Sequence, residues 1–282
     1  MADKNTIEKL KDLACELRKD VLRICNKGGS HIGGDLSMVE IMTVLYKYAM
    51  KYDPKNPEWE DRDRFILSKG HGAGCFYATL AMAGYFTMEE VLEEYRKLDS
   101  PFGEHPSGKI PGIEISTGSL GHGLPISVGM ALAARLDGRK NRVFTLMGDG
   151  ETQEGSVWEA AMAAANFKLG NLVAFVDRNR LSLDGPTEEI MKLEPYADKW
   201  KAFGWNVVEV DGHSIEELVD AIDNLPPVDS DVPTVIIAHT VKGKGVPSME
   251  NDFNWHAGSI DDEFLKKACE EIDEARKRER GE

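Results

Sequence analysis

The sequence lacks the features of a membrane, secreted or zinc-binding protein. No hydrophobic run in its 282 residues approaches the roughly 18 residues that a membrane-spanning helix needs. The N-terminal stretch MADKNTIEKLKDLACELRKD is charged and amphipathic, which is not the pattern of a signal peptide. Only four cysteines are present, and they are scattered without a CxxC pair. These absences predict a reduced, cytoplasmic protein with no contact to a membrane and no structural zinc.

Positive charge is also scarce. The chain has 34 lysines and arginines against 49 aspartates and glutamates, which leaves a net charge of −15. Nucleic acid is therefore not an expected partner, because its phosphates bind basic surfaces. An anionic ligand would need a local device, such as a metal ion, a helix N-terminus or a few placed cations. The motifs G-x-G-x-x-G and G-x-x-x-x-G-K-[ST] are both missing, which disfavours the alternative of a non-catalytic nucleotide-binding protein.

The sequence does contain short, fully apolar runs that alternate with helical patterns. We expect helices at about 6–26, 37–49, 73–83, 124–136, 157–167 and 260–280, and strands at 64–68, 143–147, 172–176, 206–210 and 234–238. Continuously apolar strands separated by helices are typical of a parallel sheet that is covered on both faces. The predicted fold class is α/β, a doubly wound and mostly parallel sheet flanked by helices, in a single domain over residues 1–282.

Glycine and polar residues gather where the predicted strands end. Ligands of open parallel sheets bind beyond this edge. Gly148-Asp149-Gly150 and Asn179 follow consecutive strands, one β-α-β unit apart, so a carboxylate and a carboxamide would lie side by side. Mg²⁺ takes one or two carboxylates together with phosphate oxygens, and glycines let a phosphate approach the backbone. A lone GDG is a common turn signal, but the spaced pair favours a site for Mg²⁺ and a phosphate ligand.

The thiamine-diphosphate motif of transketolases resembles the segment GDGETQEGSVWEAAMAAANFKLGNLVAFVDRNRLSLDG, which begins at Gly148. The resemblance implies that Asp149, Asn179 and the carbonyl of Leu181 bind Mg²⁺. It also implies that the backbone N–H of Gly150 binds the diphosphate of thiamine diphosphate. Glu154 matches a glutamate that lies at the subunit interface of the family and helps to organise the paired cofactor sites.

Further motifs of the family follow in the same order along nearly the whole chain. They are GGSHIGG, DRDRFILSKGHG, EHPS, STGSLGHG, and KGKG followed by NWHAG. The resemblance implies three catalytic, substrate-facing histidines, which are His31, His105 and His256. It further implies that the side chains of His71, Lys242 and His256 contact the cofactor, with Lys69 beside His71. The backbone at Gly118, Ser119 and Leu120 would hold the aminopyrimidine ring.

Some positions depart from the family pattern or keep an ordinary interpretation. Ile32 replaces the usual proline after His31, which affects the loop and not the imidazole. His122 stands where the family usually has glutamine, so its role is open. We expect His213 and His239 to be surface histidines or satisfied core histidines.

The resemblance implies a ketol transferase of the pentose phosphate pathway that moves a two-carbon unit from a ketose phosphate to an aldose phosphate. Histidines with pKa values near neutrality suit the proton transfers at sugar hydroxyls. Transketolases also have a pyrimidine-binding domain, whose glutamate protonates the aminopyrimidine, and a C-terminal domain. No segment of this chain matches either domain. We therefore expect a separate C-terminal subunit to supply them, in a heterotetramer of two chains of each kind (alpha2beta2).

Three alternatives stay within thiamine-diphosphate chemistry. The α subunit of a 2-oxo acid dehydrogenase also has a GDG motif and a separate partner, but the histidine set and SKGHG disfavour it. A transketolase-like subunit for an unusual sugar remains open, because part of the substrate pocket would lie on the partner. A regulatory module that only binds the cofactor would not need His31, His105 and His256.

Overall fold

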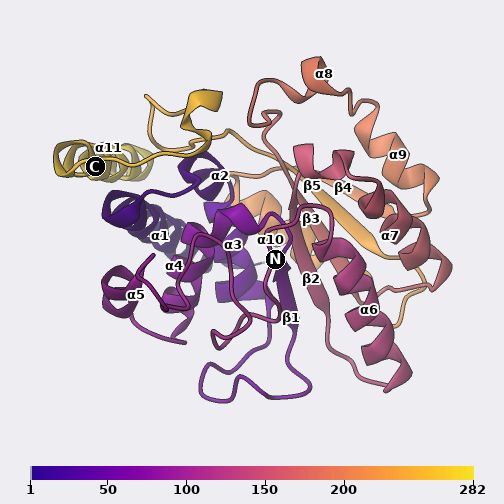
Figure 1. Cartoon of the computed structure of the whole chain (residues 1–282). Coiled ribbons are helices and arrows are strands. Elements are labelled where there is room, and N and C mark those ends of the chain that lie inside the picture. The colour runs from indigo at the N-terminus through magenta and orange to yellow at the C-terminus, as the bar shows by residue number, and fades with distance from the viewer. Residues whose placement is uncertain (1) are drawn as a thin grey trace.

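The computed structural model describes residues 2–282 and is built around a five-stranded sheet. All neighbouring strands are parallel, in the order β1-β2-β3-β5-β4. The strands are β1 Arg64–Leu67, β2 Val143–Gly148, β3 Leu172–Arg178, β4 Asn206–Asp211 and β5 Thr234–His239. Every residue of β3 is buried, because this strand lies in the middle of the sheet with helices on both faces (Figure 1). The arrangement confirms the predicted α/β, doubly wound fold.

Most of the helices match the predicted segments, but the helix expected over 37–49 begins at Val39 after a break at Met38, and shorter elements lie between the predicted ones. The α-helices are α1 Lys4–Gly28, α2 Ile32–Ser37, α3 Val39–Val44, α4 Ala73–Ala83, α5 Met88–Glu94, α6 Gly123–Leu136, α7 Gly155–Asn166, α8 Thr187–Ile190, α9 Tyr196–Ala202, α10 Ile215–Asp223 and α11 Asp262–Arg280. A π-helical turn is η1 Leu45–Ala49, and the 3-10 turns are η2 Gly70–Gly72, η3 Gly150–Gln153 and η4 Phe253–His256. None of the described helices is long and apolar enough to cross a membrane.

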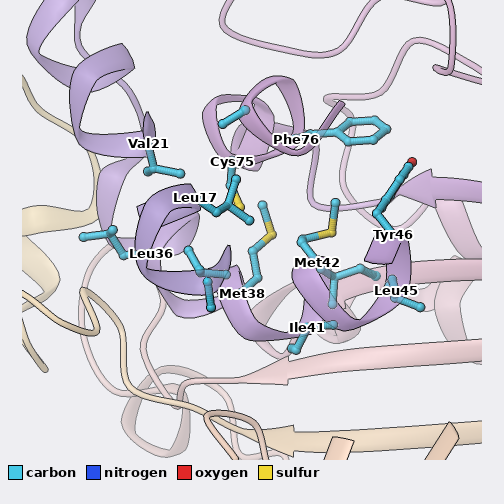
Figure 2. Packing of buried hydrophobic residues seen from close by; sticks show 14 of the residues in the cluster. Leu17, Val21, Leu36, Met38, Ile41, Met42, Leu45, Tyr46, Cys75 and Phe76 are labelled. Carbon is cyan, nitrogen blue, oxygen red and sulfur yellow. The ribbon is translucent and has the colours of Figure 1, made fainter. Parts of the chain in front are cut away.

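One face of the sheet carries the larger of two hydrophobic clusters. Leu17 and Val21 of α1 pack there against Leu36 of α2, Met42 of α3 and Phe76 of α4, and all five side chains are buried (Figure 2). Helix α1 lies on this face because its apolar residues repeat with helical spacing along one side. The cluster supports α2 and the start of α4, which place the loops of the site.

The opposite face is covered by α6, α7 and α9. Buried alanines of α7 contribute to a second cluster that includes Trp200 and Trp205. The Trp205 ring N–H donates to the carbonyl oxygen of Ala161 at 2.9 Å, so this large side chain is buried with its polar atom satisfied. The small alanine side chains let α7 lie close to the sheet, where they pack in the same cluster as residues of β2 and β3.

A buried acid lies on α2, next to the site. Asp35 has no exposed surface, its Oδ1 accepts from the backbone N–H of Cys75 at 2.9 Å, and its Oδ2 has no hydrogen-bond partner. Burial raises the pKa of Asp35 from 3.8 to about 6. The folded protein therefore binds this proton more tightly than the unfolded chain does. Stability contributed by the protonated acid is present below the unfolded pKa and is lost as the pH rises through the folded value.

Replacing Asp35 with asparagine is expected to raise the free energy of unfolding at pH 8 by roughly 2–3 kcal/mol, because each pKa unit corresponds to about 1.4 kcal/mol. The amide oxygen would still accept from Cys75, and no buried charge would remain. Urea unfolding at about pH 4.5 and pH 8 measures the effect, which should be smaller at the lower pH. Asp229→Asn, at an exposed aspartate, is the control. An unchanged pH dependence in Asp35→Asn would contradict the prediction.

Candidate active site

A cavity of about 620 Å³ opens at the carboxyl edge of the sheet. It is lined by all but two of the residues that the sequence predicts for the site, namely His31, His71, Gly118, Leu120, Asp149, Gly150, Glu154, Asn179, Leu181, Lys242 and His256. The two exceptions are exposed. Ser119 lies between two lining residues, and the ring of His105 lies beside that of His31, with centroids 5.9 Å apart. Residues far apart in the sequence thus meet at this edge, as the ends of parallel strands require.

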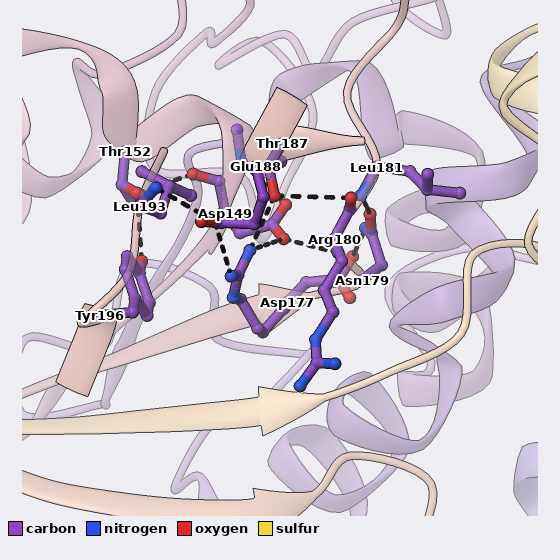
Figure 3. A network of polar contacts seen from close by, with 12 residues as sticks. Asp149, Thr152, Asp177, Asn179, Arg180, Leu181, Thr187, Glu188, Leu193 and Tyr196 are labelled. Carbon is purple, nitrogen blue, oxygen red and sulfur yellow. Dashed lines mark hydrogen bonds and ion pairs between the residues drawn. The ribbon is translucent and has the colours of Figure 1, made fainter. Parts of the chain in front are cut away.

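Asp149 follows β2 and is almost completely buried, with 1% of its surface exposed. Its Oδ2 accepts from the backbone N–H of Arg180 at 2.6 Å and from the guanidinium of Arg178 at 2.9 Å (Figure 3). Because Arg180 directly follows Asn179, these contacts bring the tips of β2 and β3 together. Burial raises the pKa of Asp149, and Arg178 opposes that rise. The predicted carboxylate and carboxamide therefore lie on adjacent strand ends.

The amide of Asn179 is oriented by a buried carboxylate. Asp177 has no exposed surface and accepts from Asn179 Nδ2 at 3.1 Å, from Lys69 Nζ at 2.5 Å and from Ser37 Oγ at 2.6 Å. Thr240 donates to its other oxygen. Burial alone would raise the pKa of Asp177, but Lys69 and the hydrogen bonds lower it, so the group is ionised. Asp177 thus accepts from the amide nitrogen of Asn179, and the amide oxygen accepts from the backbone N–H of Leu181 at 3.1 Å in this structure.

The donor set fits a Mg²⁺ ion that is shared with a phosphate ligand. The described residues contain no group of three or more histidines, cysteines, aspartates or glutamates that could hold a metal by themselves. One carboxylate, one amide oxygen and a carbonyl form the incomplete shell that Mg²⁺ completes with phosphate oxygens and water. The loop carbonyls already face a cation, because Lys242 Nζ lies 3.4 Å from the oxygen of Leu181 and 3.1 Å from that of Ser182.

The backbone around Gly150 is used internally in this structure. Its N–H donates to Asp149 Oδ1 at 2.8 Å, so a diphosphate that binds this N–H would have to replace that contact. A side chain at position 150 would crowd the loop, because a Cβ there would lie 3.0 Å from Ser182 Oγ. The hydroxyl of Ser182 is buried without a partner and lies on the cavity wall, where a polar ligand atom could satisfy it.

Three histidine rings form a cluster on the other side of the cavity. The ring centroids of His31, His71 and His256 are 5.3 to 5.5 Å apart. Burial and then Lys242 lower the pKa of His256 to about 3, while burial and Lys69 hold the pKa of His71 well below its usual range. Burial also lowers the pKa of His31. The imidazoles are therefore neutral at pH 7 and can both accept and donate hydrogen bonds to a hydroxylated ligand. The pKa of His256 lies well below the near-neutral value expected from the sequence, because the ring is buried beside Lys242.

Lys242 connects the histidines to the proposed metal loop. Its Nζ lies 2.8 Å from His256 Nδ1, so the ammonium donates to this nitrogen. Burial and the neighbouring Lys69 lower the pKa of Lys242 to about 8. Lys69 itself is paired with Asp177, which leaves Lys242 as the cation best placed for an anionic ligand in the described part of the cavity wall.

The remaining histidines lie outside the cavity. His122 is exposed at the start of α6. As expected, His213 and His239 have partners of their own, since His213 lies 3.0 Å from a carboxylate oxygen of Glu40 and His239 lies 2.9 Å from one of Glu209. Ile32 is buried at the start of α2, where it packs in the core.

The sequence analysis missed two charged residues that support the site. Glu151 is buried and accepts from the backbone N–H groups of Gly121 and Gly148, both at 3.0 Å, and from the hydroxyl of Ser68. It thereby ties three loops of the cavity together. The available signal was a further acid directly after the Gly148-Asp149-Gly150 turn.

The second missed residue is Arg178, whose side chain is 1% exposed at the end of β3. Besides Asp149 it contacts Glu194 at 2.8 Å and Glu188 at 3.2 Å, and its guanidinium lies 5.2 Å from the centroid of the Tyr196 ring. Arg178 therefore joins the proposed metal ligand to residues 187–196. This segment includes α8 (Figure 1), and its residues Ile190 and Met191 line the cavity.

The chain matches a known family over most of its length. Residues 7–275 match the family described as the thiamine diphosphate binding domain of transketolase. The chain is 43% identical over 258 residues to one of the named subunits of the apulose-4-phosphate transketolase of Phocaeicola vulgatus, and the match covers 91% of each protein. It is 42% identical over 259 residues to SqwG, a subunit of the 6-deoxy-6-sulfo-D-fructose transketolase of a Clostridium species, covering 91% of this chain and 94% of the relative.

Solved structures agree with the sequence matches. The transketolase of Campylobacter jejuni superposes with a TM-score of 0.87 at 31% identity, over 96% of this chain and 43% of that protein. Human transketolase is 39% identical over 272 residues, again over 96% of this chain and 43% of the relative. The chain thus spans less than half the length of these transketolases and nearly all of the two subunits. Sequence, fold and the polar edge of the sheet together place this chain in the transketolase family, as a thiamine-diphosphate-binding domain.

Proposed function

We propose that this chain is the thiamine-diphosphate-binding subunit of a two-chain, cytoplasmic transketolase. The complex would transfer a two-carbon ketol unit from a ketose phosphate to an aldose phosphate, with Mg²⁺ as the metal. The observation that carries this proposal is a single cavity that combines the donor pair of Asp149 and Asn179 with the cluster of His31, His71 and His256. A cofactor-binding module without catalysis would need only the first of these two features.

Residues at one end of the cavity would bind the metal and the diphosphate, and residues at the other end would contact the sugar. Asp149, Asn179 and the carbonyl of Leu181 would hold Mg²⁺, with Lys242 and His71 facing the diphosphate. Bound thiamine diphosphate supplies the electron sink that ketol transfer requires. The neutral imidazoles of His31 and His256, with His105 at the rim, would orient the sugar hydroxyls and exchange protons with them.

A partner chain would complete the site. We propose that residues 1–282 form the single cofactor domain and that the partner brings the pyrimidine-binding and C-terminal domains, including the activating glutamate. The rim of the cavity suits a protein contact, since it exposes 40% to 59% of each of four large apolar residues, which are Leu183, Ile190, Met191 and Phe253. The subunit names of the relatives support a partner, and a heterotetramer would follow the paired sites that Glu154 indicates.

A transketolase for an unusual sugar is the second candidate. Two relatives that match this chain over nearly their whole length are named for apulose-4-phosphate and for 6-deoxy-6-sulfo-D-fructose. A branched or sulfonated ketose would use the same chemistry at the cofactor and differ only in the groups that its distal end contacts. Comparing turnover of the complex with such ketoses and with ordinary ketose phosphates separates the two candidates.

The purified chain is expected to be inactive by itself with a ketose phosphate donor and an aldose acceptor. Adding the partner chain should raise turnover by at least about 100-fold, because the partner supplies a general acid and closes the site. The chain carrying Asp149→Asn, mixed with the same partner, is the control for background activity. Full turnover by the chain without a partner would contradict the two-chain proposal.

A further inference from the structure

Two charged side chains, Arg18 and Glu40, and the ring of His213 come from distant segments and meet in the interior beside the active-site cavity. Arg18 of α1 donates to Glu40 Oε1 of α3 at 2.5 Å, and the ring of His213, in the turn before α10, lies 3.0 Å from Glu40 Oε2. The side chains of Arg18 and Glu40 are 7% and 9% exposed. None of the three lines the cavity. Removing the charges of Arg18 and Glu40 from water is unfavourable, so these side chains need partners that offset this cost.

The hydrogen bonds determine which nitrogen of His213 carries the proton. The backbone N–H of Val241 points at Nε2 over 2.8 Å, and an amide N–H can only donate. Nε2 is therefore the acceptor, and Nδ1 carries the hydrogen that is donated to Glu40. Although burial opposes it, Arg18 and then His213 lower the pKa of Glu40 to about 2, so Glu40 is the ionised acceptor between two donors.

The series of contacts from Arg18 through Glu40 to His213 holds the loop 241–245 at both of its ends. At one end His213 accepts from Val241, and at the other Arg18 Nε donates to the carbonyl oxygen of Lys244 at 3.0 Å. Gly245 lies directly on Arg18, where a Cβ would come within 2.5 Å of the arginine Cδ, and its φ of 89° is in the left-handed region that favours glycine. The loop backbone is thus fixed on both sides of the residue that enters the cavity.

That residue is Lys242. Its side chain is long and flexible, so the position of its ammonium depends on how firmly the backbone is held. Next to it, Gly243 N–H donates to the carbonyl oxygen of Gly33 at 2.9 Å, which joins the loop to α2. From this backbone position the ammonium reaches the oxygen of Ser182 and the ring of His256.

We propose that Arg18, Glu40 and His213 are positioning residues that hold the loop 241–245 and thereby keep the Lys242 ammonium at the anion-binding end of the cavity. The inference deepens the proposed function, because it takes Lys242 to face the cofactor diphosphate. These residues touch no ligand and act only through Lys242. A change at His213 should therefore appear as weaker cofactor binding, and it should have no such effect once Lys242 has lost its charge.

His213→Phe is expected to weaken Mg²⁺-dependent binding of thiamine diphosphate by about tenfold, the scale on which groups behind a ligand-binding residue act. Phenylalanine fills the site but offers no acceptor to Val241. His213→Gln, whose amide oxygen can accept from Val241, should bind within about threefold of the wild type. Calorimetric titration of the full-length chain measures each affinity, and thermal unfolding shows that each variant is folded. Arg18→Lys, which keeps the ion pair but loses the donor to Lys244, provides a second variant with the same expected loss.

A double-mutant cycle separates positioning from general stability. In a Lys242→Met background, His213→Phe should cause no further loss of affinity, because the group through which it acts is absent.

Glu114→Gln is the matched control for Glu40→Gln, since Glu114 forms a comparably buried ion pair with Arg62 near the start of β1, at the opposite edge of the sheet. Both variants should lower the melting temperature, but only Glu40→Gln should weaken binding.

Two results would overturn the inference: wild-type affinity in a folded His213→Phe or Arg18→Lys variant, or an equal loss with and without Lys242. A wild-type chain that fails to bind Mg²⁺ and thiamine diphosphate, with or without its partner, would instead overturn the proposed function. The two failures are therefore distinguishable in one set of titrations.

Discussion

Asparagine in place of Asp149 is expected to weaken Mg²⁺-dependent binding of thiamine diphosphate by about 100-fold or more. Loss of a residue that only supports a metal ligand costs about 10-fold to 100-fold in affinity, and Asp149 is proposed to be a ligand itself. Asp149 is the only carboxylate in the proposed donor set, and Mg²⁺ binds neutral oxygens alone much less well. The fold should survive the change, because the buried Arg178 keeps Glu188 and Glu194 as partners. Titration calorimetry with and without Mg²⁺ measures the loss.

The control for this variant is Asp184→Asn. Asp184 also lines the cavity but is exposed and has no assigned role, so its loss should change affinity by less than about threefold, as expected for an exposed charge. Equal affinity in Asp149→Asn and the wild type would contradict the metal assignment. Titration of both variants with NAD, for which the chain has no motif, should show no binding.

Alanine in place of His256 should reduce turnover of the two-chain complex by about 100-fold or more, the usual contribution of a residue that moves a proton in the rate-limiting step. Stability should change little, because the ring is only half-buried and its recorded side-chain hydrogen bond is to Lys242. Steady-state kinetics with a ketose phosphate donor gives the effect on turnover, and a thermal melt gives the effect on folding.

His239→Ala is the matched control for His256→Ala. This histidine is also partly exposed and pairs with Glu209, but it lies outside the cavity. The complex with His239→Ala should therefore keep the turnover of the wild type. Retention of full turnover by His256→Ala would remove this residue from the proposed proton transfers.

The features that the sequence could predict depend on short-range patterns. Apolar runs located all five strands to within one or two residues at each end. Burial on both faces leaves a continuous signal in the inner strands, whereas β4 at the edge is only partly buried. The parallel order then brings Asp149 and Asn179 together without further information. By contrast, α8 and α9 are too short for a helical period, and the helix expected over 37–49 begins instead at Val39 after a break at Met38.

The supporting contacts could not be predicted, because they join residues that the sequence does not relate. The pair of Lys69 and Asp177, or of Glu40 and His213, depends on how the loops cross above the sheet. A histidine such as His213 resembles any surface histidine until its partners are known. The resemblance to the family identified most of the cavity lining, whereas the residues behind the lining needed the structure.

The four segments that converge on Asp177 have a practical consequence for redesign. The end of α2, the start of the loop after β1, the loop after β3 and the loop after β5 all use this one acid as a common fixed point. A substitution at the floor of the cavity would disturb several loops at once. Attempts to change sugar preference should therefore leave unchanged Asp177 and the four residues that donate to it, which are Ser37, Lys69, Asn179 and Thr240.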